Sequence, residues 1–199
     1  MYVRANVISE RDTNPYKLVT RRIDSNKIRL GQKKDIEVHI SSAHEMDIIK
    51  DNPGRSGAII YTHVNGQTLF CLGIDTESCD LTDFGGGVKK DETPIEGGLR
   101  ELYEESQGIF GDLTPKDVEN SIMFHSHNMG IMFINMDIDP TEIETRFQTQ
   151  IETNPCPEVS GVVWLTTHEL LESIHGRGSK LYIRVRKLLS KVTNVISDL

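Results

Sequence analysis

Apolar residues in the middle of the chain recur in short runs that are typical of β-strands. The runs GAIIYTHV and LFCLGI flank NGQT, and the dipeptide Asn65-Gly66 favours the two-residue turn of a β-hairpin. A third strand is expected at 81–88. Two further runs, SIMFHSH and GIMFINMDI, and the later run VSGVVWL at 159–165 predict three more strands.

Other segments have the spacing of helices. Thr93-Pro94-Ile95-Glu96 forms a capping box, so a helix is expected from Pro94 to about Gln107. A short helix, THELLESI, is expected at 167–174, and a basic amphipathic helix is expected from Ser179 onward. The apolar stripe of this last helix consists of Leu181, Val185, Leu188, Leu189, Val192 and Ile196. Because strands and helices are interspersed, the pattern predicts a mixed α/β fold with helices packed on a sheet.

The first fifty residues have a weaker pattern and are interpreted as an N-terminal extension. Alternating residues at 36–40 predict a short strand, and SAHEMDIIK at 42–50 is compatible with a short helix. The domain is therefore expected to span 51–199 and to end in the basic helix. A homodimer, in which the extension pairs with a second copy, is left open.

Composition narrows the class of protein. The 199 residues are enough for one ordinary domain, and 37% hydrophobic with 26% charged residues is typical of a globular chain. The sequence contains no stretch of about 18 apolar residues, so no membrane span is expected. The first residues lack the apolar core of a signal peptide. Three cysteines without paired metal spacing favour a reducing, cytoplasmic location.

The net charge of −8 is distributed unevenly. Residues 51–176 contain six Lys/Arg and twenty-two Asp/Glu, whereas 1–50 and 177–199 carry net charges of +3 and +5. An acidic centre does not favour general nucleic-acid binding. It is compatible with an acidic, metal-loaded site that receives an anionic substrate, with cations on the flanks.

Three carboxylates in the helix expected at 94–107 form a candidate metal site. Glu101, Glu104 and Glu105 are spaced i, i+3, i+4, so they share one helix face and repel each other by a few tenths of a kcal/mol per pair. No lysine lies between Asp91 and Gln107 to balance them. A divalent cation reverses that repulsion, and Mg²⁺ prefers oxygen ligands of this kind.

The residues around these carboxylates suggest supporting roles. Arg100 is expected to pair with Glu92 and to tie the preceding loop to the helix. Gly85, Gly86 and Gly87 end the preceding strand, where glycine lets the backbone approach a ligand closely. A glycine carbonyl there is a candidate for one more metal ligand.

The spacing of these residues resembles the Nudix box of the Nudix hydrolase superfamily. Gly86, five residues, Glu92, seven residues, then Arg100-Glu101-Leu102, one residue and Glu104-Glu105 match it at seven fixed positions. The box covers about a tenth of the chain. The pattern expects glycine at the position of Gln107, and here glycine comes one residue later, at Gly108. We therefore expect one extra helical residue before the turn.

The resemblance implies a Nudix-like α/β/α sandwich with a mixed sheet and a hydrolase that cleaves diphosphate linkages in substrates of the type nucleoside diphosphate–X. It implies that Glu101, Glu104 and Glu105 hold Mg²⁺ or Mn²⁺, with the Gly85 carbonyl as a further ligand. Gly86, Glu92 and Arg100 would give structural support.

A proton acceptor for the attacking water is also implied by the resemblance. Glu104 or Glu105 could fill this role, and Glu158, just before the strand expected at 159–165, is the alternative for the base or for a substrate contact.

Other substrates and another class of function remain compatible with the same motif. Capped RNA is one substrate, because basic residues at 21–34 and 177–191 could follow an RNA backbone, and inositol diphosphates are another. A Nudix-fold binding module without catalysis is the third alternative. Such a module would be expected to lose carboxylates of the box, and this chain keeps them all.

A few residues outside the box are candidates for chemistry. His125 and His127 have the spacing of one strand face, but no third ligand accompanies them, so zinc is not expected there. Trp164 lies in an apolar run and is expected in the core. Arg55 is either a phosphate contact or an exposed loop cation.

Overall fold

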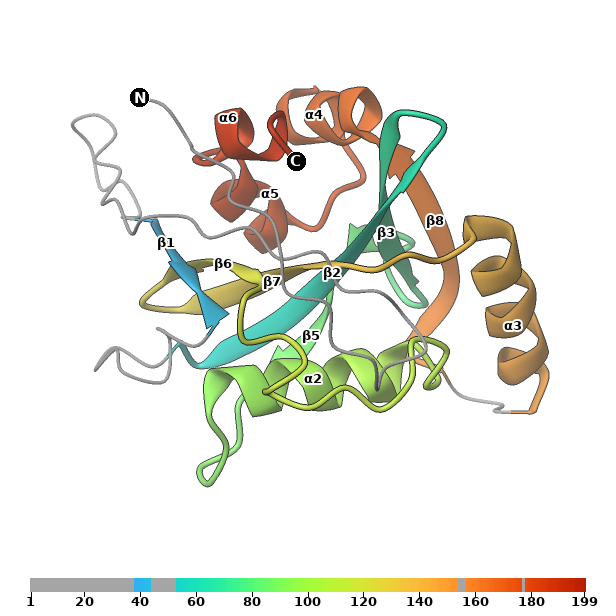
Figure 1. Ribbon diagram of the computed structural model, residues 1–199, viewed down its shortest axis with the longest axis horizontal. Coiled ribbons are helices and arrows are strands. Elements are labelled where there is room, and N and C mark those ends of the chain that lie inside the picture. Colours follow the sequence, from blue (N-terminus) through green and yellow to red (C-terminus); the bar gives the residue numbers. More distant parts are fainter. Residues whose placement is uncertain (1–37, 44–52, 154–156, 177) are drawn as a thin grey trace.

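The computed structural model describes residues 38–43, 53–153, 157–176 and 178–199, and these residues form one eight-stranded sheet with helices on both faces (Figure 1). The strands are β1 (His39–Ser42), β2 (Arg55–Val64), β3 (Gln67–Asp75), β4 (Leu81–Thr82), β5 (Phe84–Gly87), β6 (Ile122–Ser126), β7 (Met129–Asn135) and β8 (Val159–Thr166). The helices are α2 (Pro94–Glu105), α3 (Pro140–Thr153), α4 (Thr167–His175), α5 (Ile183–Leu189) and α6 (Thr193–Ile196). The predicted mixed α/β class is confirmed.

The sheet is mixed because β2 runs parallel to β7 and antiparallel to its other partners. The strand order is β1-β6-β7-β2-β3-β4, with β5 also paired to β2 and β8 to β3. The predicted hairpin joins β2 to β3 through Asn65 and Gly66, whose φ angles of 51° and 79° are both positive. This is the backbone geometry that the Asn-Gly dipeptide favours in a two-residue hairpin turn.

The strand predicted at 81–88 is divided into two. β4 pairs with β3, whereas β5 pairs with β2, so the chain changes partner at Asp83. The side chain of Asp83 is fully buried and forms an ion pair with Arg55, which places a polar interaction where a continuous strand was expected.

Two hydrophobic cores lie on the two faces of the sheet. One core joins Ile59, Phe70 and Phe124 to the helices α4, α5 and α6. The other joins Ile60, Cys71 and Met132 to α2 and α3. Figure 1 shows α2 on the side of the sheet opposite α4, α5 and α6. Odd and even positions of β2 therefore serve different cores, as the two-residue period of a strand requires.

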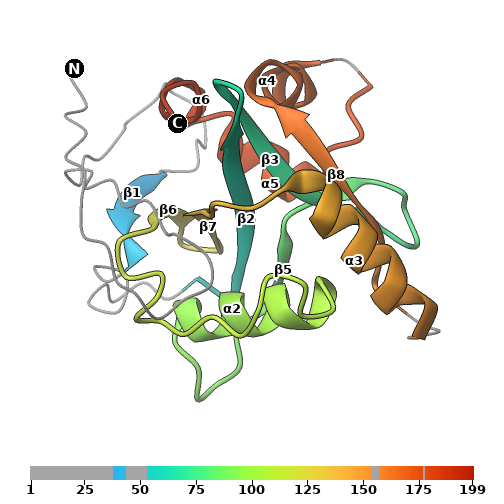
Figure 2. The same cartoon turned by 45° about the vertical axis from the view of Figure 1, so that its right-hand side comes forward.

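Helix α3 is an element that the sequence pattern did not reveal to us. Its side chains Ile143 and Phe147 are buried, and Ile151 packs against the same core at the next i+4 position. Figure 2 shows α3 beside β8, which it contacts. The start was signalled by Asp139-Pro140, because proline suits the first turn and the Asp139 carboxylate accepts a hydrogen bond from the Thr141 amide at 2.9 Å.

The C-terminal helix differs from its prediction. The apolar stripe is buried as expected, but Val185, Leu188 and Leu189 lie in α5 and Ile196 lies in α6, with Val192 in the turn between them. The expected start at Ser179 is wrong, because Leu181 forms a β-bridge with Leu81 and α5 begins only at Ile183. The β-branched residues Val192, Thr193 and Val195 are weaker helix formers than leucine or lysine, which disfavours one continuous helix through the turn. Each short helix is held by tertiary packing instead.

Several predictions for the N-terminal extension lie outside the described residues. The strand expected at 36–40 is present as β1 from His39, but its first residues are not described, and neither is most of the short helix expected at 42–50. In the described part of the chain, no helix has the length and apolar character needed to cross a membrane.

Candidate functional site

Helix α2 begins at the predicted capping box. The Thr93 hydroxyl accepts a hydrogen bond from the Glu96 amide at 3.2 Å, and the Glu96 carboxylate accepts one from the Thr93 amide at 2.8 Å. Ile95, Leu99 and Leu102 are buried against the sheet. Glu96 is therefore used by the helix start, and the remaining carboxylates lie on a different face from the buried leucines.

A glycine brings α2 close to the sheet. A Cβ atom on Gly98 would lie 2.8 Å from the Ser56 hydroxyl oxygen and 2.9 Å from the Met132 methyl carbon, which is closer than real Cβ contacts allow. Gly98 is thus needed for the contact between α2 and β2.

Gly86 makes room for the first carboxylate of the face. A Cβ on Gly86 would lie 2.5 Å from the carboxyl carbon of Glu101. The Glu101 side chain, 13% exposed, is therefore pressed against the backbone of β5. This contact joins β5 to α2. Gly86 and Glu101 are both positions of the box pattern described above, and here they touch.

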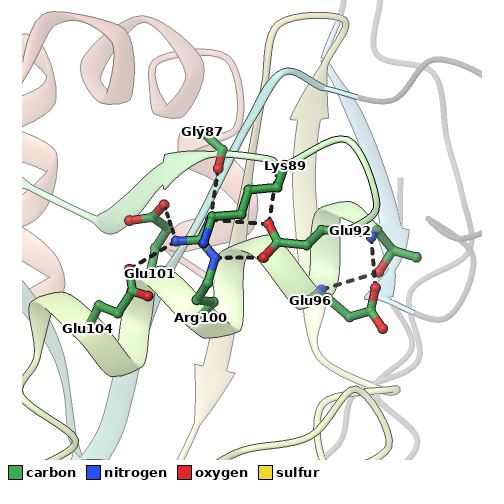
Figure 3. Close-up of polar contacts among 8 residues, drawn as sticks. Gly87, Lys89, Glu92, Glu96, Arg100, Glu101 and Glu104 are labelled. Carbon is green, nitrogen blue, oxygen red and sulfur yellow. Dashed lines mark hydrogen bonds and ion pairs between the residues drawn. The ribbon is translucent and has the colours of Figure 1, made fainter.

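Arg100 joins the acidic residues of α2 to the loop before it (Figure 3). Its Nε donates to Glu92 at 2.7 Å, and its Nη2 donates to the Gly87 carbonyl at 2.9 Å. Its Nη1 lies between two carboxylates, 2.7 Å from Glu101 and 2.9 Å from Glu104. The pair expected between Arg100 and Glu92 is present, and the hydrogen bond to Arg100 lowers the pKa of Glu92 to about 2.

Glu105 is the carboxylate most strongly affected by its surroundings. Its Oε2 accepts a hydrogen bond from the Gly85 amide at 2.7 Å. Burial raises the pKa of Glu105 to about 8, and the negative charges of Asp83 and Glu101 add to the effect, while the Gly85 amide and Arg55 oppose it. In the metal-free protein this carboxyl group is therefore largely protonated at neutral pH.

The carbonyl of the same glycine is bound by Arg55. Nη2 of Arg55 donates to the Gly85 oxygen at 2.8 Å, and the guanidinium forms a two-point ion pair with Asp83, both contacts at 2.8 Å. Arg55 is 13% exposed and Asp83 is fully buried. Arg55 is thus the first residue of β2, held inside the structure, and the expectation of an exposed loop cation is wrong.

Asp83 is a residue of this site that the sequence analysis missed. Its space is provided by Gly57 and Gly85, which lie opposite each other on β2 and β5. A Cβ on Gly85 would lie 2.9 Å from an Asp83 oxygen, and one on Gly57 would collide with the same atom. The sequence did contain a signal for it. Asp83 is an acidic residue inside a segment expected to be a strand, and a charge buried in a strand needs a partner of opposite charge.

The other sequence candidates lie apart from this face. Glu158 is exposed just before β8, and its backbone carbonyl accepts a hydrogen bond from the Thr76 amide. His125 is buried in β6, whereas His127 is exposed in the turn that follows. Trp164 is half-buried against the core that α2 and α3 cover.

The carboxylates match the ligand chemistry of a hard divalent cation. Glu101, Glu104 and Glu105 present oxygen donors on one helix face, which suits Mg²⁺ or Mn²⁺. Among the described residues, no three acidic, histidine or cysteine side chains already converge as a ligand set. Glu101 and Glu104 are turned toward Arg100, and Glu105 toward the Gly85 amide. The donors fit the ion, provided that these side chains turn away from their present partners.

A cavity of about 340 Å³ lies on the other flank of α2. It separates the helix from residues 112–115, and Leu99, Tyr103 and Leu113 are among its lining residues. It shares Arg100 and Glu104 with the carboxylate face. Glu101 and Glu105 do not line the cavity. Glu104 is therefore the one proposed metal ligand that also lines it.

The end of α2 departs from the sequence-based expectation. The helix ends at Glu105 with Ser106 as its C-cap, and Gln107 takes a left-handed φ of 57°. The Gly108 amide donates to the Tyr103 carbonyl and the Gln107 amide to the Glu104 carbonyl, which together form a Schellman motif. The extra residue expected before the turn is therefore absent. Gln107 adopts the conformation that glycine usually provides.

Comparison with known proteins yields likenesses only among solved structures. Neither a protein-family model nor a curated protein sequence matches the chain. An Ap4A hydrolase from C. elegans is 15% identical, with 71% of this chain and 96% of that one covered at a TM-score of 0.43. A MutT/nudix family protein from Listeria innocua is 16% identical, with coverage of 72% and 93% and a TM-score of 0.46.

A Nudix hydrolase from M. smegmatis is 9% identical, with 74% of this chain and 88% of that one covered at a TM-score of 0.47. The solved structures that resemble the chain are thus Nudix hydrolases of low sequence identity. At such identities the activity of the chain has to be argued from its own residues.

Proposed function

We propose that the protein is a metal-dependent hydrolase that cleaves diphosphate linkages in nucleoside diphosphate–X substrates. The observation that supports this proposal most strongly is the contact of Glu101 with Gly86, together with the ion pair of Arg100 with Glu92. Positions from three separate parts of the Nudix-box pattern, Gly86, Glu92 and the pair Arg100-Glu101, meet in space at these two contacts. A solvated acidic helix face would require neither of them.

Glu101, Glu104 and Glu105 are proposed to hold Mg²⁺ or Mn²⁺. When bound, the ion neutralises diphosphate oxygens and lowers the pKa of a coordinated water. Arg100 keeps Glu101 and Glu104 side by side on the helix before loading, because its Nη1 donates to both. Its further contacts with Glu92 and Gly87 fix the guanidinium at this position.

Glu104 is the proposed proton acceptor for the attacking water. It is 55% exposed, so its carboxylate can reach a substrate that approaches from solvent, whereas Glu105 is held by the Gly85 amide. Glu158 is the alternative acceptor, from the loop before β8. A pH–rate profile of Glu158→Gln distinguishes the two, because loss of the true base removes the corresponding limb of the profile.

A hydrolysis screen identifies the substrate. The protein is incubated with Mg²⁺ or Mn²⁺ and dinucleoside polyphosphates, ADP-ribose, nucleotide sugars, nucleoside triphosphates, inositol diphosphates or capped RNA, and the products are identified. Glu104→Gln should reduce turnover at least ~100-fold if a carboxylate ligand or base is lost. Glu172→Gln, an exposed helical glutamate on α4, is the matched control and should keep wild-type turnover. Unchanged turnover in Glu104→Gln would contradict the proposal.

Capped RNA is a second candidate because α5 presents Arg184 and Lys187 to solvent. If RNA is the substrate, its turnover should fall steeply with added salt and with charge reversal at these two positions. Equal, salt-insensitive rates on capped RNA and on a free cap dinucleotide would favour the small-molecule substrate. A protein that binds these ligands and turns none of them over would be a binding module.

A further inference from the structure

We propose that Arg55 replaces a metal ion at the Gly85 carbonyl, so that divalent ions are held by the glutamates of α2 and not by this oxygen. The inference rests on the proposed function, because it concerns the loading of the same site. Arg55 would then be a positioning residue that holds the Gly85 carbonyl. Arg55 lies outside the Nudix box, so the spacing of the box does not predict this role.

The two polar groups of Gly85 already have partners from different parts of the chain. Its amide donates to Glu105 on α2, and its carbonyl accepts from Arg55 on β2. The glycine peptide is thus held between a carboxylate on one side and a guanidinium on the other. This arrangement fixes the direction in which the carbonyl oxygen points.

The Arg55 guanidinium is itself fixed. Asp83 binds it through both carboxylate oxygens, and Thr82 donates a further hydrogen bond to Asp83 at 3.2 Å. Asp83 is fully buried in the space that Gly57 and Gly85 leave open. Arg55 cannot swing away from Gly85 without leaving a buried carboxylate unpaired, which is strongly unfavourable.

A metal ion on the Gly85 oxygen would meet this fixed positive charge. The guanidinium nitrogen lies 2.8 Å from the oxygen, so an ion bound to the same atom would stand within a few ångströms of Arg55. The ion would have to share the oxygen with a guanidinium that Asp83 holds in place, because Nη2 already occupies one lone pair of this oxygen. Arg55 already supplies the positive charge near Glu105 and Asp83 that an ion at this position would supply.

The test is the binding of Mn²⁺, counted by the electron paramagnetic resonance signal of the free ion at fixed pH. In Arg55→Met/Asp83→Ala, both members of the buried pair are removed together and the Gly85 carbonyl becomes available. We expect this double variant to bind one more Mn²⁺ per chain, or to bind Mn²⁺ about tenfold more tightly, as a gain of one ligand would allow. Arg55→Lys keeps the cation and should retain the wild-type number of ions.

A matched control is Arg186→Met. Arg186 also donates to two backbone carbonyls, those of Ile174 and Gly176, but on the opposite face of the sheet. Its removal should leave Mn²⁺ binding unchanged. Wild-type Mn²⁺ binding in the double variant would overturn the inference. An unchanged Mn²⁺ affinity in Glu101→Gln and Glu104→Gln would instead contradict the proposed metal site itself.

The unmodified protein provides a second test that does not depend on the folding of a variant. The Nη–H protons of Arg55 are held in hydrogen bonds, so their nuclear magnetic resonance signals should be protected from exchange. We expect those signals to persist at saturating Mg²⁺. Their loss on addition of Mg²⁺ would show that the ion displaces Arg55 from Gly85 and would overturn the inference.

Discussion

At the scale of single residues, the site depends on which partner each charge has. Arg100 offsets the repulsion between neighbouring carboxylates. Its guanidinium contacts Glu92, which lies just before α2, and Glu101 and Glu104, which lie on α2. Glu105 lies outside that contact and is half-buried beside the Gly85 amide. Glu92, whose pKa is lowered to about 2, and Glu105, whose pKa is raised to about 8, therefore differ in protonation at neutral pH.

Glu105 should make the metal-free protein less stable as the pH rises. Its pKa is about 8 in the folded protein and near the ordinary 4.5 when unfolded, so the folded state binds an extra proton between these values. The stabilisation is fully present below about pH 4.5 and is lost as the pH rises through 8. Thermal unfolding in a chelator, from pH 5 to 8, should show a smaller fall in Tm for Glu105→Gln than for the wild type.

Parallel curves for the two proteins would show that Glu105 is ionised in the folded state throughout this range. The comparison is informative because the histidines and other groups that titrate in the window are common to both proteins. Only the difference between the curves reports on Glu105.

At the scale of elements, the ends of α2 are built differently. The N-terminus follows its sequence signal, since Thr93 and Glu96 satisfy each other's backbone amides. The C-terminus has the hydrogen bonds of a Schellman motif, although its left-handed position is occupied by Gln107. Glycine is usual there because a side chain in this conformation costs about 1–2 kcal/mol.

We expect Gln107→Gly to stabilise the protein by about 1 kcal/mol, because it relieves the left-handed strain at the end of α2. Gly108→Ala is the reciprocal variant and should be destabilising by about 1 kcal/mol, since Gly108 also has a positive φ. Urea unfolding measures both changes. A loss of stability in Gln107→Gly would mean that the hydrogen bond from the Gln107 side chain to the Glu104 carbonyl outweighs the strain.

At the scale of the whole molecule, the site is built from segments that are distant in the sequence and that the sheet brings together. β2 contributes Arg55, the β4–β5 junction contributes Asp83, β5 contributes Gly85 and Gly86, and α2 contributes the glutamates. The central part of the chain carries the excess of acidic residues, so the candidate metal site lies in the most negative segment. A bound divalent ion should therefore stabilise the folded chain as a whole.

Mg²⁺ should raise the Tm of the wild-type protein. An ion at 100 times its Kd adds about 2.7 kcal/mol to the free energy of unfolding, which corresponds to roughly 5–10 °C for a chain of this size. The shift should be lost in Glu101→Gln. Differential scanning calorimetry with NaCl at matched ionic strength separates specific binding from screening. Equal shifts in both proteins would contradict a specific site at the carboxylates.

The sequence by itself determined the elements whose signals are local. The Asn65-Gly66 turn, the capping box of α2 and the acidic face of that helix all depend on residues within four positions of each other, and the structure contains each of them. The pair of Arg100 with Glu92 also follows from spacing, since Glu92 lies just before α2 and Arg100 follows it by eight residues, inside the helix. Helix α3 had a local signal at Asp139-Pro140 that its polar composition obscured.

Only the tertiary structure decided the surroundings of Gly85. Arg55 and Asp83 are 28 residues apart, and their pairing depends on β2 lying beside β5, which no local pattern encodes. The division of the C-terminal stripe into α5 and α6 likewise depends on packing against the sheet. Local propensities act over one or two turns of chain, whereas a buried charge finds its partner only when the strands have come together.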